Sequence, residues 1–394
     1  MTLRNTHQVL AMALLTVASV TAQNTTLTSF VDSKPYEGVY IERLFYLDQN
    51  QSIQELYNYG GWLVQNPTLD SGAQVASQGS ALTSFYDSFG IQHMFYVDAS
   101  LNVHELYNDG QWWNNRLTGG TTDPRNNRVT GAATNAPGAR DQLALTSCFD
   151  NHNIEHVFYI DPVNHVRELK NNGQWASDDV TAATNTPGAA YESGLTSFCD
   201  SSGDPNVFYT TGNLNHIEWL IYAGGQWQSN DITGATNGPA AAFANALTSF
   251  FDSFGIGHVF YLESSQNVRE LYMVNGRWFG NSLTADTDSP VAASEGGLTS
   301  FFDTYGIEHV FYIDISDHVR ELYNNGQWQT NNLTADTNSP APAHASALTS
   351  FFDSQGEHVF YVDTIDHIIE LYNTNGPWQS KDLTAATTAP LATP

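Results

Sequence analysis

The chain has few basic residues, few cysteines and, beyond its first twenty residues, no long apolar run. Thirteen Lys and Arg stand against 41 Asp and Glu among 394 residues, a formal net charge of −28. Nucleic acids and anionic membranes attract basic surfaces, so we expect neither as a partner. No segment after residue 22 approaches the roughly 18 apolar residues of a membrane helix, so we expect no membrane span.

Motifs of covalent and cofactor chemistry are also missing. The chain shows no nucleophile triad, no phosphate-binding loop and no catalytic carboxylate pair, which argues against hydrolytic or redox chemistry and against a bound cofactor. Charged residues make up only 14% of the chain while aromatic residues reach 12%. This composition, rich in Asn, Thr, Ser and Gly besides, is typical of β-rich extracellular proteins.

The first 22 residues have the pattern of a secretory signal peptide. One Arg precedes an apolar run from Val9 to Val20, and small residues follow up to a cleavage position after Ala22. We therefore expect a secreted protein in which residues 23–394 form one domain. Three Asn-x-Ser/Thr triplets fit this route as glycosylation sites. They begin at Asn24, Asn50 and Asn332.

One sequence unit fills nearly all of the chain after residue 22. The triplet Leu-Thr-Ser, followed by aromatic residues, recurs seven times, at intervals of 50 (Leu145 to Leu195) to 63 residues (Leu82 to Leu145). A fixed period of this length is the signature of a repeat architecture. The seven units begin near Leu27, Leu82, Leu145, Leu195, Leu247, Leu298 and Leu348.

Each unit contains four short runs with strand composition. In the sixth unit they are LTSFFD, HVFYID, HVRELYN and QWQTNNLT, and Asn-Gly or Asp-Gly usually separates the third run from the fourth, as in a tight hairpin. The second run is apolar on both faces and must be covered from both sides. These features predict an all-β fold, a seven-bladed β-propeller with four antiparallel strands in each blade. A parallel β-solenoid is the rival, but its coils are shorter and lack regular hairpin turns. All four strands of a blade lie within one repeat, so closing the ring needs no exchanged strand unless the tail from Ala385 to Pro394 contributes.

The two cysteines fall in adjacent repeats. Cys148 occupies the fourth position of LTSCFD and Cys199 the fifth position of LTSFCD, one unit later. Adjacent strand positions face opposite sides, so both thiols could enter the space between the third and fourth blades. A disulfide and two buried free thiols are both compatible with this pattern.

Three side chains recur at fixed positions of the repeat. A Trp opens the fourth run, a Glu lies in the third run, and a His opens the second run in five of the units. The Trp side chains that could contact a ligand are Trp175, Trp227, Trp278, Trp328 and Trp378. The Glu positions are Glu168, Glu270, Glu321 and Glu370, and the His positions are His156, His258, His309 and His358.

The scheme of an aromatic second strand, a Val-x-Glu third strand and a Trp-led fourth strand resembles the β-propeller lectins of the fucose-specific type, along the whole chain after residue 22. In that family a sugar lies between blades, held by an Arg from the second strand, a Glu from the third and an aromatic ring. The resemblance implies that the Trp, Glu and His positions above bind glycans. The Arg position departs from the family, because only the first repeat has it, as Arg43.

The residue types suit a sugar, since the CH face of a sugar ring packs on an indole while carboxylates and imidazoles bond its hydroxyls. Blade packing alone would also explain a Trp or Glu in every repeat. His309 and His318, or His358 and His367, open adjacent strands, a pattern that could indicate a metal site. Zinc needs three or four converging ligands, and no such cluster is evident in the sequence, so we expect no metal.

Two irregular segments favour a second function. The first repeat inserts SKPYEGVYIE, which brings Tyr36 and Tyr40, and a long link after the second repeat carries Arg116 at its start, then Arg125 and Arg128. Together they could cover a single pocket for a small apolar or aromatic molecule. By size, signal peptide and repeat pattern the chain also resembles, more weakly, the fungal hetero-Diels–Alderases of tropolone–sesquiterpene pathways. Such an enzyme needs no cofactor and works by positioning two reactive partners.

Overall fold

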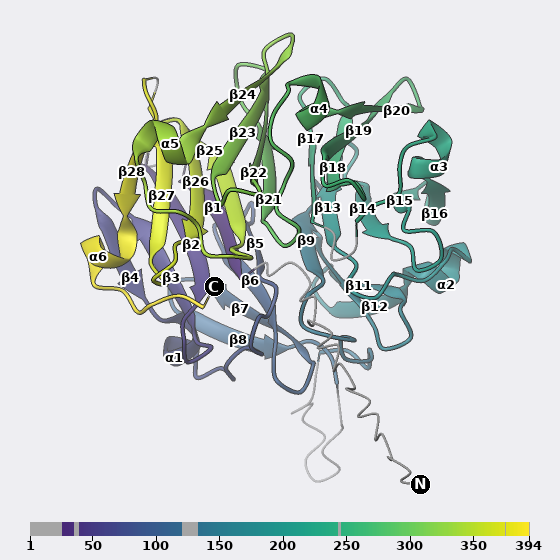
Figure 1. Ribbon diagram of the computed structural model, residues 1–394. Helices are drawn as coiled ribbons and strands as arrows, with labels where there is room; N and C mark the ends of the chain where they lie inside the picture. Colours follow the sequence, from purple (N-terminus) through teal and green to yellow (C-terminus); the bar gives the residue numbers. More distant parts are fainter. Residues whose placement is uncertain (1–25, 35–38, 120–132, 243–245, 375, 394) are drawn as a thin grey trace, which may run out of the picture.

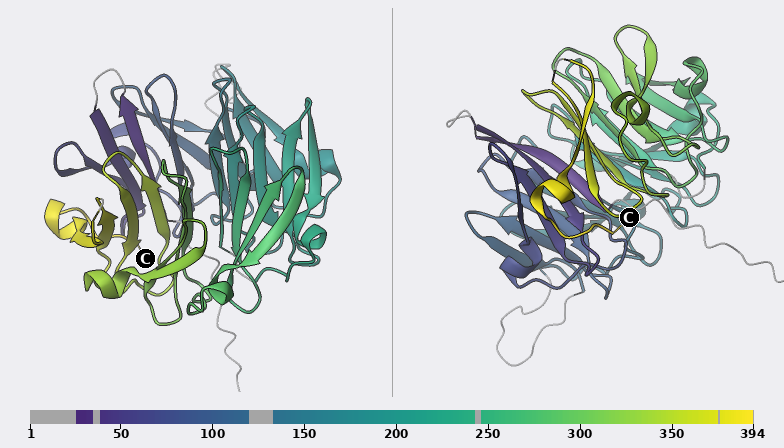
Figure 2. Two further views of the ribbon diagram at one scale, coloured as in Figure 1. Left: turned by 90° about the horizontal axis from the view of Figure 1, so that it is seen from above. Right: turned by 60° about the vertical axis from the view of Figure 1, so that its left-hand side comes forward.

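The computed structural model describes residues 26–34, 39–119, 133–242, 246–374 and 376–393, which form seven four-stranded antiparallel sheets arranged in a ring (Figures 1 and 2). In each sheet the strands lie side by side in chain order, and no strand is exchanged between repeats. The predicted all-β, seven-bladed propeller is confirmed, and the solenoid alternative is excluded.

The strands of the first four blades have the following bounds. Blade 1 contains β1 (Leu27–Lys34), β2 (Val39–Leu47), β3 (Ile53–Asn58) and β4 (Trp62–Gln65). Blade 2 contains β5 (Thr83–Tyr86), β6 (Gln92–Val97), β7 (Val103–Asn108) and β8 (Trp112–Arg116). Blade 3 contains β9 (Leu145–Phe149), β10 (Glu155–Ile160), β11 (Val166–Asn171) and β12 (Trp175–Asp179). Blade 4 contains β13 (Leu195–Cys199), β14 (Pro205–Thr210), β15 (Ile217–Ala223) and β16 (Gln226–Asp231).

The last three blades repeat the same order. Blade 5 contains β17 (Leu247–Phe251), β18 (Gly257–Leu262), β19 (Val268–Val274) and β20 (Arg277–Ser282). Blade 6 contains β21 (Leu298–Phe302), β22 (Glu308–Ile313), β23 (Val319–Asn324) and β24 (Trp328–Asn332). Blade 7 contains β25 (Leu348–Phe352), β26 (Glu357–Val362), β27 (Ile368–Asn373) and β28 (Gln379–Asp382). We call the space between two neighbouring blades a gap and number it by its blades, so gap 5/6 lies between blades 5 and 6.

The first strands of the blades form the inner ring and contact one another around it (Figure 1). At every gap the Thr hydroxyl of one Leu-Thr-Ser triplet shares a hydrogen bond of 2.7–2.9 Å with the Ser hydroxyl of the next. The seventh bond, Thr349 to Ser29, joins the last blade to the first. The recurring triplet is thus explained by a closed belt of hydroxyl groups. Its members are Thr28–Ser84, Thr83–Ser147, Thr146–Ser197, Thr196–Ser249, Thr248–Ser300, Thr299–Ser350 and Thr349–Ser29.

The links from one blade to the next are held by a buried Tyr. In each second strand one Tyr, such as Tyr312, is fully buried and donates its hydroxyl proton to a backbone carbonyl of the preceding link, here that of Pro290 at 2.7 Å. The C-terminal tail supplies this carbonyl for blade 1, because Tyr46 donates to Pro390 at 2.8 Å and Ala392 pairs with Asp48. The tail therefore contributes to closing the ring, in the place where other blades have a link (Figure 2).

In the described part of the chain, six one-turn helices follow the outer strands of all blades but blade 2. They are α1 (Pro67–Ser71), α2 (Val180–Thr184), α3 (Ile232–Thr236), α4 (Leu283–Asp286), α5 (Leu333–Thr337) and α6 (Leu383–Thr387). Five of them start at an Asn or Asp whose side chain accepts a hydrogen bond from a free backbone N–H of the first turn. Among the described residues no helix has the length and apolar character needed to cross a bilayer.

Aromatic side chains fill the gaps between blades. The second strands are buried on both faces, as the sequence predicts. A Trp at the start of each outer strand packs edge-on against a Phe in the second strand of the preceding blade, with centroids 5.9–6.5 Å apart. The pairs are Trp62–Phe360, Trp112–Phe45, Trp175–Phe95, Trp227–Phe158, Trp278–Phe208, Trp328–Phe260 and Trp378–Phe311.

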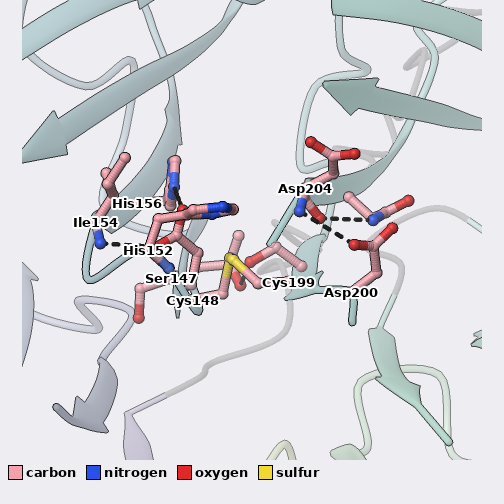
Figure 3. Close-up of a disulfide and its surroundings, with 12 residues drawn as sticks. Ser147, Cys148, His152, Ile154, His156, Cys199, Asp200 and Asp204 are labelled. Atoms are coloured by element: carbon pink, nitrogen blue, oxygen red, sulfur yellow. Dashed lines mark hydrogen bonds and ion pairs between the residues drawn. A yellow bond between two sulfur atoms is a disulfide. The ribbon is translucent and has the colours of Figure 1, made fainter. Parts of the chain in front are cut away.

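Gap 3/4 contains the disulfide that the sequence left open. Figure 3 shows Cys148 of β9 bonded to Cys199 of β13, with their Cα atoms 5.7 Å apart. At the same two positions gap 4/5 has Phe198 stacked on Phe251 at 5.6 Å. The disulfide thus replaces an aromatic pair of the inner ring.

Removing one hydroxyl from the belt should destabilise the protein. We expect Thr248→Val to lower the free energy of unfolding by about 1 kcal/mol, because Ser300 loses its partner at 2.9 Å. Thr330→Val is the matched control, since its buried hydroxyl has no hydrogen-bond partner among the described residues. Urea unfolding of both variants provides the measurement, and equal losses would contradict a specific role for the belt.

Truncating a gap Trp should cost far more. Trp278 is 9% exposed, so we expect Trp278→Ala to destabilise the fold by about 3–5 kcal/mol through the cavity it leaves. Trp113 of β8 is 43% exposed, and its replacement by Ala should change stability by about 0.5 kcal/mol or less. Thermal and urea unfolding of the two variants provide the measurement. Equal losses of stability would contradict a packing role for the gap Trp.

Candidate functional site: the clefts between blades

The recurring His and Glu form a pair within each blade that contains both. His258 lies near the start of β18, and Glu270 of β19 lies diagonally across the ladder on the same face. His258 Nδ1 is 2.8 Å from Glu270 Oε1. The same contact recurs at 2.7–2.9 Å in blades 2, 3, 6 and 7, and the pairs are His93–Glu105, His156–Glu168, His309–Glu321 and His358–Glu370.

Both members of the pair are held by further side chains. In blade 6, Asp303 of the turn after β21 lies 3.5 Å from His309 Nε2, and the Asn331 amide donates to Glu321 Oε2 at 2.7 Å. Burial alone would lower the pKa of His309, but its bonds to Asp303 and Glu321 outweigh burial and raise the pKa to about 9. The Glu carboxylates are 2–3% exposed in blades 3, 5, 6 and 7, so they are not free acceptors at a surface.

Aromatic rings fix the orientation of the imidazole. In blade 5 the ring of Phe250 stacks on His258 at 4.9 Å, and Tyr272 lies on the other side at 6.2 Å. Equivalent rings flank His93, His309 and His358. The imidazole nitrogens therefore point in fixed directions, one toward the turn Asp and the other into the gap.

A second carboxylate, from the next blade, lies beside this pair. It was not among the site residues predicted from the sequence. Glu308, the first residue of β22, places its Oε2 3.4 Å from His258 Nδ1. Glu155 lies 3.3 Å from His93 in the same way, and Glu357 lies 3.9 Å from His309. The signal was present in the recurring Glu-His-Val triplet, because adjacent residues of a strand face opposite sides and so enter two different gaps.

The second carboxylate has an unusual environment. Burial, followed by the nearby charge of Glu270, raises the pKa of Glu308 to about 8. Burial and Glu105 likewise raise the pKa of Glu155 to about 8, and burial and Glu321 raise that of Glu357 to about 7. In each of four gaps, three side chains thus converge as a candidate metal-binding group, although no such cluster is evident from the sequence. The groups are His93–Glu105–Glu155, His258–Glu270–Glu308, His309–Glu321–Glu357 and His358–Glu370–Glu42.

Gap 5/6 opens to solvent as a cleft of about 280 Å³. Its floor contains His258, Glu270 and Glu308, and its walls include Phe254, Tyr272, Phe302, Asn281 and Asn324. Phe254 is 73% exposed and meets Phe302 edge-on at 6.0 Å. The cleft therefore combines apolar ring faces at its mouth with hydrogen-bonding groups at its base.

The other three gaps differ in the same positions. In gap 1/2 the pair is Arg43 and Glu55, facing Gln92 of blade 2. Blade 4 has Asn206 and Trp219 in place of His and Glu, and Gly257 of blade 5 faces them. In gap 3/4 the pair His156–Glu168 is intact, but Pro205 stands where other blades have the second Glu.

The Trp positions lie in the gaps as packing partners of Phe. Trp175, Trp227, Trp278, Trp328 and Trp378 each make the edge-on contact described above. Three largely exposed aromatic residues occupy equivalent places in the turns between the first and second strands. These are Phe89, Phe254 and Tyr305, which are 70–73% exposed.

The structure separates the residues proposed for a single pocket. Tyr40 of β2 is half exposed and lines a cavity of about 430 Å³ with Tyr305 and Phe352. Arg116 lies at the end of β8 in blade 2, where its guanidinium donates to the Gly119 carbonyl at 2.6 Å. Tyr36, Arg125 and Arg128 lie outside the described residues.

Two of the three glycosylation triplets can be placed. Asn50 is exposed in the turn after β2. Asn332 caps α5, accepting a hydrogen bond from Ala335 N at 3.1 Å, while the Thr334 hydroxyl is buried and accepts from Val319 N. Asp179 and Asp382 cap α2 and α6 in the same way, so the triplet at Asn332 also reflects a helix cap. Asn24 lies outside the described residues.

No protein-family model and no curated protein matches the chain. Solved structures do resemble it. The BP39L lectin from Burkholderia pseudomallei has 13% sequence identity and a TM-score of 0.65, covering 95% of this chain and 100% of its own. A six-bladed fungal lectin from Aleuria aurantia, with a described fucose recognition mode, has 13% identity and a TM-score of 0.55, covering 95% and 99%. AofleA from Arthrobotrys oligospora has 15% identity and a TM-score of 0.53, covering 77% and 86%. At these identities the likeness is one of fold, and the chain has the fold of the lectin-like β-propellers.

Proposed function

We propose that the protein is a secreted carbohydrate-binding propeller with several sites in the gaps between its blades. The observation that supports this most directly is the set of exposed aromatic rings at equivalent turns of blades 2, 5 and 6. These are the blades of Phe89, Phe254 and Tyr305, and all three also contribute a His–Glu pair to the gap that follows. An exposed ring beside a cleft with polar groups at its base, as Phe254 is in gap 5/6, is suited to ligand contact.

The cleft of gap 5/6 illustrates how a sugar would be held. The ring of Phe254 offers an apolar face to the CH groups of a pyranose. The Asn281 and Asn324 amides and the Glu308 carboxyl lie deeper in the cleft and can bond its hydroxyls. Several weak sites on one rigid ring would bind a branched or clustered glycan through avidity.

The solved neighbours support a glycan as the ligand class. Structures of the Aleuria aurantia lectin contain α-methyl-L-fucoside and Fucα1-6GlcNAc. In this chain His stands at five of the seven positions where the family has Arg, and each His is bonded to a Glu. The proposal is therefore for a glycan, without the fucose specificity of that family.

A glycan array provides the test. We expect the wild-type protein to bind a defined set of glycans, and the double variant Phe254→Ala/Tyr305→Ala to lose at least tenfold in apparent affinity. Two mouth rings are removed at once because multivalent binding would mask the loss of one. Both side chains are largely exposed, so the fold should be retained.

Ile315→Ala is the matched control. Ile315 is 65% exposed, but it lies in the turn between β22 and β23, at the opposite end of the strands from Phe254. Its variant should bind like wild type. Absence of binding to every glycan, or equal loss in the control, would refute the proposed role of the clefts.

A second candidate is cofactor-free cycloaddition in the cavity beside Tyr40. We propose it because this cavity, of about 430 Å³, is lined by three aromatic residues, and Tyr40 comes from the irregular first hairpin. An oxadiene and an alkene held there would form one C–C and one C–O bond without losing an atom or exchanging electrons with the protein. The aromatic walls would hold the two partners in a reactive orientation.

Incubation with an o-quinone methide precursor and humulene tests this activity. Product should form at least tenfold faster than without protein, and Tyr40→Ala should remove most of the acceleration. Tyr59→Ala is the control, because Tyr59 is 61% exposed and does not line the cavity. A rate equal to the spontaneous one would eliminate this candidate.

A further inference from the structure

The His–Glu–Glu clusters of gaps 2/3, 5/6, 6/7 and 7/1 bring two carboxylates to the same nitrogen of one buried imidazole. In gap 2/3, Asp87 lies 3.5 Å from His93 Nε2, while Nδ1 on the other side of the ring faces two carboxylates. Glu105 Oε1 is 2.8 Å and Glu155 Oε2 is 3.3 Å from Nδ1. Two buried carboxylates at one imidazole nitrogen require either protons or a metal ion between them.

The second carboxylate has an unfilled bonding position. Glu155 is only 9% exposed, and its Oε1 accepts from Asn171 at 2.9 Å. Its Oε2 is directed at His93 and has no hydrogen-bond donor in the described part of the chain. The same holds for Oε2 of Glu308 and of Glu357, so three equivalent buried oxygens are left without a donor.

Gap 1/2 shows what the same position holds when the chain itself supplies the cation. Arg43 takes the place of His, and its guanidinium contacts Asp32 at 2.9 Å and Glu55 at 2.5 Å. The residue facing it from blade 2 is the neutral Gln92, whose amide lies 2.8 Å from Nη2. In gap 1/2 the guanidinium faces a neutral amide, whereas in gaps 2/3, 5/6, 6/7 and 7/1 the shorter imidazole faces a second carboxylate. Gap 3/4 has the imidazole of His156 but Pro205 in place of the second Glu.

We propose that each of the four clusters binds one divalent transition-metal ion of the zinc class, through His Nδ1 and two Glu carboxylates. Ligands at about 2.0–2.2 Å from a tetrahedral zinc lie about 3.3–3.6 Å apart. The contacts of Nδ1 with the second carboxylate, 3.3 Å in gap 2/3 and 3.4 Å in gap 5/6, have this length, and the 2.8 Å contacts with the first carboxylate would lengthen when the ion binds. In each cluster the three ligand atoms lie within 4.8 Å of one another. Imidazole together with carboxylates favours zinc and its neighbours over calcium, which prefers six or more oxygens.

The surroundings have the features of a metal site. The turn Asp behind each imidazole is the outer partner that fixes the orientation of a metal-binding His. In gap 5/6 the cleft gives an ion access from solvent and leaves room for water as a fourth ligand. A further His–Asp group, Asp161–His165–Asp179, is different, because Arg167 already lies 2.7 and 2.9 Å from its two carboxylates.

The experiment is a Zn²⁺ titration of the whole protein after chelator treatment, followed by calorimetry, with anomalous diffraction at the zinc edge to locate the ions. We expect four equivalents, one for each cluster. The double variant His258→Arg/Glu308→Gln converts gap 5/6 to the arrangement of gap 1/2 and should bind three. The reverse variant Arg43→His/Gln92→Glu should bind five. Glu308→Gln alone is a milder variant that should also bind three if the double variant does not fold.

Surface histidines provide the control. His344 has a 72% exposed side chain, so His344→Ala should leave the number of tight sites unchanged. Binding whose stoichiometry is the same in wild type and in both gap variants, or zinc found only at exposed histidines, would overturn the proposal and leave the carboxylates of each cluster sharing protons. Neither result depends on sugar binding, so the proposed function is tested separately.

Discussion

The ring depends on the hydrogen bond between a Thr of one inner strand and a Ser of the next. The inner strands pair only within their own blades, so side chains must join neighbouring sheets near the axis. The Thr–Ser bond does this seven times at nearly the same length, which sets one spacing between all blades. The Trp–Phe contacts hold neighbouring blades at the same spacing farther from the axis, and the buried Tyr fixes each link to its blade. Every gap therefore begins with the same frame, and differences among gaps arise from the few residues placed in it.

Those differences are electrostatic. A chain with a net charge of −28 places three carboxyl groups around one imidazole in four gaps, largely shielded from water. Burying unpaired charge is costly, so such an arrangement requires a compensating cation or a proton on one of the carboxyl groups. The guanidinium of Arg43 satisfies this requirement in one gap, and the imidazole satisfies it only partly in four others. Exposed rings stand beside three of these four gaps, and in gap 5/6 the cluster lies in an open cleft.

Much of the fold could be predicted because the repeat displays it many times. Seven units, four strand-like runs and a hairpin such as Asn275-Gly276, where both residues have positive φ, need only local rules. The placement of Cys148 and Cys199 in one gap follows from strand alternation. The candidate site could be predicted only in part, because its groups come from two blades. Glu308 faces a His fifty residues earlier, and its own neighbour His309 faces the opposite gap, so comparing repeats position by position does not show that the two meet. The Thr–Ser belt was hidden for the same reason, since both partners occur in every repeat and only the ring shows which ones meet.

The disulfide adds a second covalent connection between blades 3 and 4, besides the link in the chain. Its two cysteines occupy a position that exists at every gap and is elsewhere filled by an aromatic pair or by Phe351 beside Val31. Cysteine pairs at the other positions would join all the inner strands covalently, independently of the links. Such a ring would remain one molecule after proteolytic cleavage in any link, and unfolding of one blade could not release its neighbours.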